Sequence, residues 1–80
     1  MKIENDGSGL PEALRELERR MLDEQPERVV LGDDSDTALA AALVAAKLGI
    51  EIEATEAARA ASSANGRVIA QLAQPYTQPA

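Results

Sequence analysis

The middle of the chain shows the clearest change in the pattern of apolar and polar residues. Val29–Leu31 is a short, unbroken apolar run rich in β-branched residues, which is typical of a strand covered on both faces, as in a parallel sheet. Thr37–Leu48 is apolar at nearly every position and consists mostly of alanine, which predicts a closely packed helix, and Gly49 is suited to end that helix in the left-handed conformation. Ile50–Glu53 then alternates between apolar and acidic residues, which is the period of a strand with one apolar face. The pattern therefore predicts a strand, a helix and a second strand.

A helix is also predicted before this unit. An apolar stripe recurs at helical spacing, and Pro11 suits the first helical turn. The helix is expected to end at Gln25, because a residue before proline, here Pro26, is pushed away from helical angles. The stripe consists of Leu10, Leu14, Leu17 and Met21.

The segment after the second strand is helix-prone and weakly patterned. Asn65–Gly66 interrupts it, so two interpretations are open. The helix either breaks at Asn65–Gly66 or begins late with Ser62 or Ser63 as its N-cap, and the late start is favoured. Pro75 is expected to stop this helix.

Together these elements predict an α/β fold, a small Rossmann-like unit of order α-β-α-β-α with a two-stranded parallel sheet. Residues 10–74 would form this single domain. Residues 1–9 are polar and contain glycine, so a flexible N-terminus is expected there, and residues 75–80 are expected to form a C-terminal tail.

Composition limits both stability and chemistry. The 80 residues include 16 alanines, one tyrosine and neither Phe nor Trp, so little large apolar surface is available for a core. The absence of Cys and His removes thiolate chemistry, the commonest metal ligand and the usual general base near neutral pH. A net charge of −6 argues against nucleic acid or an anionic membrane as partner. The N-terminal residues lack the apolar region of a signal peptide, so a cytoplasmic protein is expected.

Acidic residues follow each predicted strand. Asp33, Asp34 and Asp36 lie at the carboxyl end of the first strand, which is where ligands bind in open α/β sheets. From spacing alone a capping role at the next helix is favoured over a ligand site, and three carboxylates there would repel phosphate. Glu56 follows the second strand and would share the same edge of a parallel pair. Two acids on one edge can divide the roles of general acid and base, although an exposed helix-start glutamate is the commoner case. No metal or cofactor is predicted.

The order of these parts resembles the N-terminal domain of the UDP-N-acetylglucosamine 2-epimerases, including the hydrolysing type. That family runs through a helix, Pro-Asp, an apolar strand, Gly-Asp, an alanine-rich helix, Ile-Pro-Val and His-Val-Glu-Ala-Gly. The corresponding parts of this chain follow in the same order at nearly the same spacing: Pro26–Glu27, Gly32–Asp33, Thr37–Leu48, Ile50–Ile52 and Glu56–Ala57. The resemblance covers residues 10–77, which correspond to a small part of a two-domain enzyme.

The resemblance implies that Asp33 and Glu56 are two active-site carboxylates, of the kind implicated in proton movement at sugar C2 and in elimination of UDP. The turn after Gly32 is one residue longer than in the family, so Asp34 is an alternative to Asp33. Ala54 replaces the family histidine and Ala58 replaces its glycine. The segment 62–67 resembles Glu-Glu-x-Asn-Arg with Asn65 kept and both acids replaced by serine, so a third acid of the site is missing. The resemblance therefore implies ancestry more than activity.

Two functions follow from these observations. The first is an epimerase-like module that is inactive alone and either binds a UDP-sugar weakly or belongs to a larger assembly. The alternative is a small non-catalytic module for protein interaction or homodimerisation. A homo-oligomer or a partner protein is expected in either case, because a sheet this small leaves its edges unpaired and alanine faces supply little stability.

Overall fold

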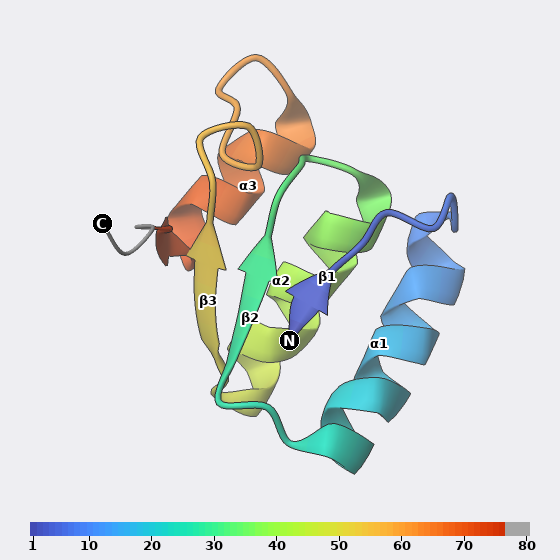
Figure 1. Ribbon diagram of the computed structural model, residues 1–80. Coiled ribbons are helices and arrows are strands. Elements are labelled where there is room, and N and C mark those ends of the chain that lie inside the picture. Colours follow the sequence, from blue (N-terminus) through green and yellow to red (C-terminus); the bar gives the residue numbers. More distant parts are fainter. Residues whose placement is uncertain (77–80) are drawn as a thin grey trace.

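The computed structural model describes residues 1–76 as a parallel sheet with three helices (Figure 1). The strands lie in the order β1-β2-β3-β4, and each neighbouring pair is parallel. The α/β fold class is thereby confirmed, but the predicted two-stranded sheet is wrong, because the sheet has four strands. The elements in chain order are β1 (Lys2–Ile3), α1 (Leu10–Glu24), β2 (Arg28–Leu31), α2 (Asp36–Leu48), β3 (Glu51–Ala54), α3 (Ala64–Leu72) and β4 (Gln74–Pro75).

The two additional strands are the short outer ones. In β1, Ile3 is buried and pairs with Leu31 of β2. In β4, Pro75 pairs with Ala54 of β3, and a proline is tolerated there because β4 is an edge strand. β1 lies within the N-terminal segment expected to be flexible, and that flexibility stays a prediction. β4 begins the segment expected to be a tail, of which residues 77–80 lie outside the described residues.

The helix boundaries follow local capping. α1 ends where Gln25 adopts a left-handed conformation with φ of 47°, directly before Pro26. Ser35 caps α2 by accepting a hydrogen bond from the Ala38 amide at 3.1 Å. Ser63 caps α3 in the same way, with the Gly66 amide as donor at 2.9 Å, so the late start of this helix is confirmed.

The core lies between the sheet and α2. Inward positions of β2 and β3 carry Val29, Leu31, Ile52 and Ala54, all buried. α2 packs against the sheet, and many of its buried residues are alanine. The alanine side chain is small, so the helix can lie close to the strands. These alanines are Ala38, Ala40, Ala41, Ala42 and Ala45.

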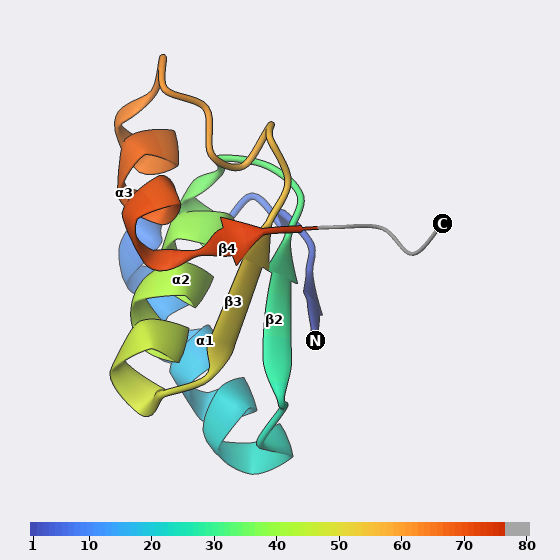
Figure 2. The same ribbon diagram turned by 90° about the vertical axis from the view of Figure 1, so that its left-hand side faces the viewer.

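Within residues 1–76, no helix lies over the opposite face of the sheet. Figure 2 shows α1, α2 and α3 on the same side of the strands. The outward residue Val30 is only half-buried, and the outward residues Arg28 and Glu53 form an ion pair at 3.4 Å. The prediction that β2 is covered on both faces is therefore wrong for residues 1–76, because the apolar run indicated burial but not which residues would supply the cover.

Candidate functional site

The candidate site lies at the carboxyl edge of the sheet, where β2 and β3 end. Leu31 and Ala54 are the last paired residues of these strands, and the Thr55 amide donates to the Leu31 carbonyl at 3.0 Å just beyond them. Asp33 and Glu56 each follow two residues after this last pair. The parallel register thus places both predicted residues at the same edge, each in the loop that leaves its strand.

Asp33 is part of the turn that leads into α2. Its carboxylate accepts a hydrogen bond from the Ser35 amide at 3.0 Å, and its side chain is half-buried. Among the possible N-caps in residues 33–36, the structure uses Ser35, while Asp33 supports the turn before it and Asp36 lies in the first turn of the helix. A carboxylate that already accepts a backbone bond keeps further acceptor capacity for a ligand.

Glu56 begins a turn of residues 56–59 and is exposed. This turn is held by backbone bonds from the Arg59 amide to the carbonyls of Thr55 at 3.1 Å and Glu56 at 3.2 Å. The Arg59 side chain donates back to the Ala54 carbonyl at 3.3 Å. Glu56 therefore stands on an ordered turn with its carboxylate open to solvent.

Asn65 links α3 to the same edge. Its side-chain amide donates to the Asp34 carbonyl and to the Asp36 carboxylate, both at 3.0 Å. One amide thereby fixes α3 against the loop between β2 and α2. Sequence analysis singled out Asn65 only through the resemblance, and its role as a clamp across 29 and 31 residues of chain required the structure.

The loop after β1 also reaches this edge, which the sequence analysis did not predict. The buried hydroxyl of Thr37 lies 3.3 Å from the Asp6 carboxylate and 3.4 Å from the Asn5 side-chain oxygen. The Ser8 amide donates to Asp6, and this hydrogen bond holds the pKa of the Asp6 carboxyl below its ordinary value. The turn-forming sequence Asn-Asp-Gly-Ser-Gly was the available signal, but it does not reveal that the loop packs against α2.

The chemistry of this edge is that of hydrogen-bond acceptors. Its carboxylates belong to Asp33, Asp34, Asp36 and Glu56 in the loops after β2 and β3, and to Asp6 in the loop after β1. The nearby arginines, Arg59 and Arg67, donate to backbone carbonyls at 3.3 Å and 3.1 Å. Among residues 1–76, no group of three or more acidic residues is placed so that it could hold a metal ion. The carboxylates therefore suit this edge to accept hydrogen bonds from hydroxyl groups.

No helix within residues 1–76 is long and apolar enough to cross a membrane.

We predict that removing the Asn65 clamp loosens α3. The variant Asn65→Ala should lower the free energy of unfolding by about 1–2 kcal/mol, because two hydrogen bonds are lost and one of them is made to a carboxylate. Urea unfolding followed by circular dichroism measures this loss. Gln71→Ala, an exposed amide in the same helix, is the matched control and should change stability little. Equal stability of the two variants would contradict the clamp.

Comparison with known proteins identifies the fold. No family model and no curated protein matches the sequence. The structure is of the Rossmann-like α/β class, and it superposes on solved structures of that class. S. aureus MnaA, in its co-structure with UDP, matches with a TM-score of 0.70 and 22% identity over 80% of this chain and 20% of that chain. A "putative UDP-N-acetylglucosamine 2-epimerase" from Listeria monocytogenes matches with a TM-score of 0.67 and 16% identity over 86% of this chain and 21% of that chain.

These two structural matches show that this chain shares a fold with part of each matched protein. The epimerase-like fold implied by the sequence resemblance is thereby confirmed. The chain spans about a fifth of the length of each matched protein.

Proposed function

We propose that this chain is an epimerase-like module that is catalytically inactive alone and binds a sugar nucleotide weakly at the carboxyl edge of its sheet. The observation that carries the proposal is the equivalent placement of Asp33 and Glu56, two residues beyond the last pair of β2 and β3. This placement occurs in a fold shared with a protein whose structure contains UDP.

The chemistry of the edge supports binding through the sugar. Carboxylates accept hydrogen bonds from sugar hydroxyls, whereas the same negative charge opposes a diphosphate. UDP-N-acetylglucosamine should therefore bind better than UDP, and both should bind weakly. Inactivity is expected because the 80 residues contain neither His nor Cys and span only about a fifth of the length of each matched protein. The cytoplasmic location expected from the sequence stays a prediction.

The thermal melt with ligand tests this proposal. Ligand at about ten times its Kd stabilises the native state by about 1.4 kcal/mol, which raises the Tm of a domain this size by about 5 °C or more. We expect this rise with millimolar UDP-N-acetylglucosamine and a smaller rise with UDP. Asp33→Asn should keep the turn, because the Asn side-chain oxygen can accept the hydrogen bond from the Ser35 amide. Both Asp33→Asn and Glu56→Gln should lose the ligand-induced rise in Tm. Glu27→Gln removes one exposed charge at the amino edge of the sheet. This control variant should show the same ligand-induced rise in Tm as the wild type. No rise in the wild-type protein would refute sugar-nucleotide binding.

A second candidate function, self-association, is favoured by the open face of the sheet. Parallel sheets are almost always covered on both faces, yet here the three helices all lie on one face (Figure 2). A second copy of the chain would cover the other face, where Val30 is half-buried. Thermal melts at several protein concentrations distinguish the two candidate functions. Self-association makes the Tm rise with protein concentration, whereas sugar-nucleotide binding makes it rise with added ligand.

A further inference from the structure

A groove runs between α1 and α2 on the outer surface of the helical layer. Its apolar lining comes from Pro11, Leu14, Leu43 and Val44, and its charged lining from Arg15, Glu18 and Lys47. We refer to these seven residues as the α1–α2 groove. Its volume is about 440 Å³, which is room for several side chains of a partner. The groove lies on the helical layer, away from the loops that form the carboxyl edge.

The outer side of α2 is unusually apolar for a surface helix. Between its ends, the exposed positions Leu43 and Ala46 are apolar, and Leu43 is 37% exposed. The half-buried Leu39 lies one turn before Leu43. A helix that is apolar on all sides is normally buried on all sides. The sheet covers one side of α2 and α1 and α3 pack against it, so the apolar residues that stay exposed on its outer side have the character of a contact surface.

The charged side chains of the groove make no ion pair within residues 1–76. Of the eight lysines and arginines, six make an ion pair or donate to a backbone carbonyl within residues 1–76. The remaining two are Arg15 and Lys47, which lie on opposite walls of the groove.

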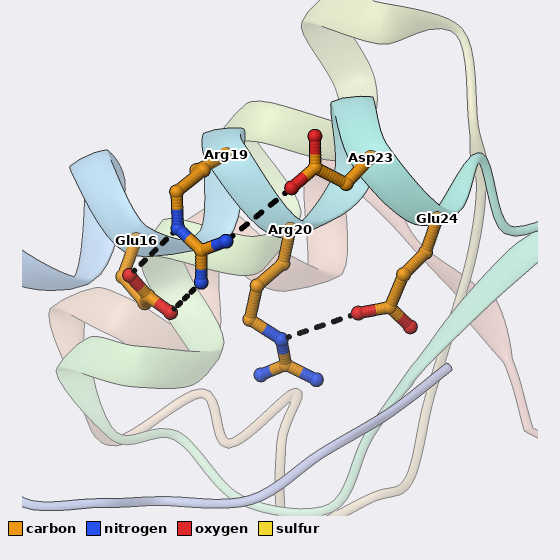
Figure 3. A network of polar contacts seen from close by, with 5 residues as sticks. All are labelled: Glu16, Arg19, Arg20, Asp23 and Glu24. Carbon is orange, nitrogen blue, oxygen red and sulfur yellow. Dashed lines mark hydrogen bonds and ion pairs between the residues drawn. The ribbon is translucent and has the colours of Figure 1, made fainter.

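The rest of α1 shows the contrast. Figure 3 shows Arg19 bound to Glu16 and Asp23, and Arg20 bound to Glu24. The Arg19–Asp23 and Arg20–Glu24 pairs measure 3.3 Å and 3.6 Å. The hydrogen bond from Arg19 also holds the pKa of the Glu16 carboxyl below its ordinary value. Five charged residues of α1 outside the groove are thus paired with each other, whereas Arg15 and Glu18 inside it make no ion pair within residues 1–76.

We propose that the α1–α2 groove binds an amphipathic helix of another protein, with leucine-like residues facing Leu14 and Leu43 and acidic residues on both flanks. The apolar stripe of such a helix would cover the exposed side of α2, in the manner of helix-in-groove recognition. Carboxylates on its flanks would pair with Arg15 on one wall and Lys47 on the other. Glu18 lies one turn from Arg15 on the same wall, so the acidic residue on that flank is expected opposite Arg15 and not opposite Glu18. This proposal is independent of sugar-nucleotide binding.

Two synthetic peptides test the proposal directly. Each is a labelled helix of about 18 residues, or about five turns, with leucines at i, i+3, i+4 and i+7. One carries glutamate on both flanks and the other carries lysine. The overall charge of −6 favours binding of the lysine peptide. Preferred binding of the glutamate peptide would therefore have to come from Arg15 and Lys47 in the groove. Fluorescence anisotropy should show saturable binding of the glutamate peptide with higher affinity than the lysine peptide.

Matched variants locate the binding surface. Leu43→Gln should weaken binding of the glutamate peptide about tenfold or more, while Leu72→Gln on α3, where the leucine is 38% exposed, should leave it unchanged. Neutralising Arg15 and Lys47 with glutamine should also weaken it, whereas Lys2→Gln should not. The proposal is overturned by equal binding of the two peptides, by Leu43→Gln binding as the wild type does, or by no saturable binding. A homodimer that Leu43→Gln dissociates would assign the groove to a second copy and would also overturn it.

Discussion

The variant Gly66→Ala is expected to lose about 3 kcal/mol of stability and to release α3 from the rest of the fold. Gly66 is buried in the first turn of α3, against the backbone of Ala60. A Cβ atom at this position would lie 2.6 Å from the Ala60 nitrogen and 2.8 Å from its carbonyl carbon, and it would overlap the carbonyl oxygen. Backbone atoms cannot rotate away as a side chain can, so the helix must move. The higher helix propensity of alanine, worth about 1 kcal/mol, does not offset this overlap.

Movement of α3 has further consequences. Ile69, which is fully buried, anchors the helix to the core, and β4 follows directly after it. Urea unfolding measures the loss of stability, and amide hydrogen exchange shows whether it is concentrated in α3. Gly32→Ala is the matched control, because no atom lies within 4 Å of the added Cβ, and its stability should change by less than about 1 kcal/mol. If Gly66→Ala unfolds at the same urea concentration as Gly32→Ala, the close packing against Ala60 is refuted.

Leu31→Ala is expected to cost about 2–5 kcal/mol, because it deletes one of the few large side chains in a core in which half of the buried apolar residues are alanine. Leu31 is fully buried in β2, between β1 and β3. The cavity cannot be filled easily by its neighbours, since Ala54 beside it is itself small. A domain of this size has about 3–5 kcal/mol of stability in total, so the variant should be largely unfolded at 25 °C.

The control for this deletion is Leu22→Ala. Leu22 lies on α1 and is 54% exposed, so the same chemical change removes little buried surface and should cost less than about 1 kcal/mol. Circular dichroism at 25 °C and urea unfolding distinguish the two variants. Similar stability of both would mean that Leu31 does not carry the core as the structure implies.

The two proposed binding surfaces occupy different parts of the molecule. The sugar-nucleotide site lies in the loops at the carboxyl edge, and the α1–α2 groove lies on the outer surface of the helices. Variants at Asp33 or Glu56 therefore should not affect peptide binding, and variants at Leu43 should not affect the response to ligand.

The sequence by itself determined the elements whose signals are local. The stripe from Leu10 to Met21, the apolar run at β2 and the caps at Ser63 and Gly49 each act within a few residues, so α1, β2, α2, β3 and α3 could be predicted within a residue or two. The positions of Asp33 and Glu56 at one edge also followed, because parallel strands end on the same side. Whether these two residues bind a ligand stays a prediction.

Only the tertiary structure decided the features that depend on distant partners. β1 and β4 have two residues each, too few to show any periodicity, and they are strands only because β2 and β3 offer them backbone groups. The contact of Gly66 with Ala60 and the clamp from Asn65 to the loop before α2 likewise depend on how α3 packs. Within residues 1–76, the sheet face without a helix and the cations Arg15 and Lys47, which form no ion pair there, also depend on packing. A sequence pattern states which side chains avoid water, whereas packing decides which neighbours cover them.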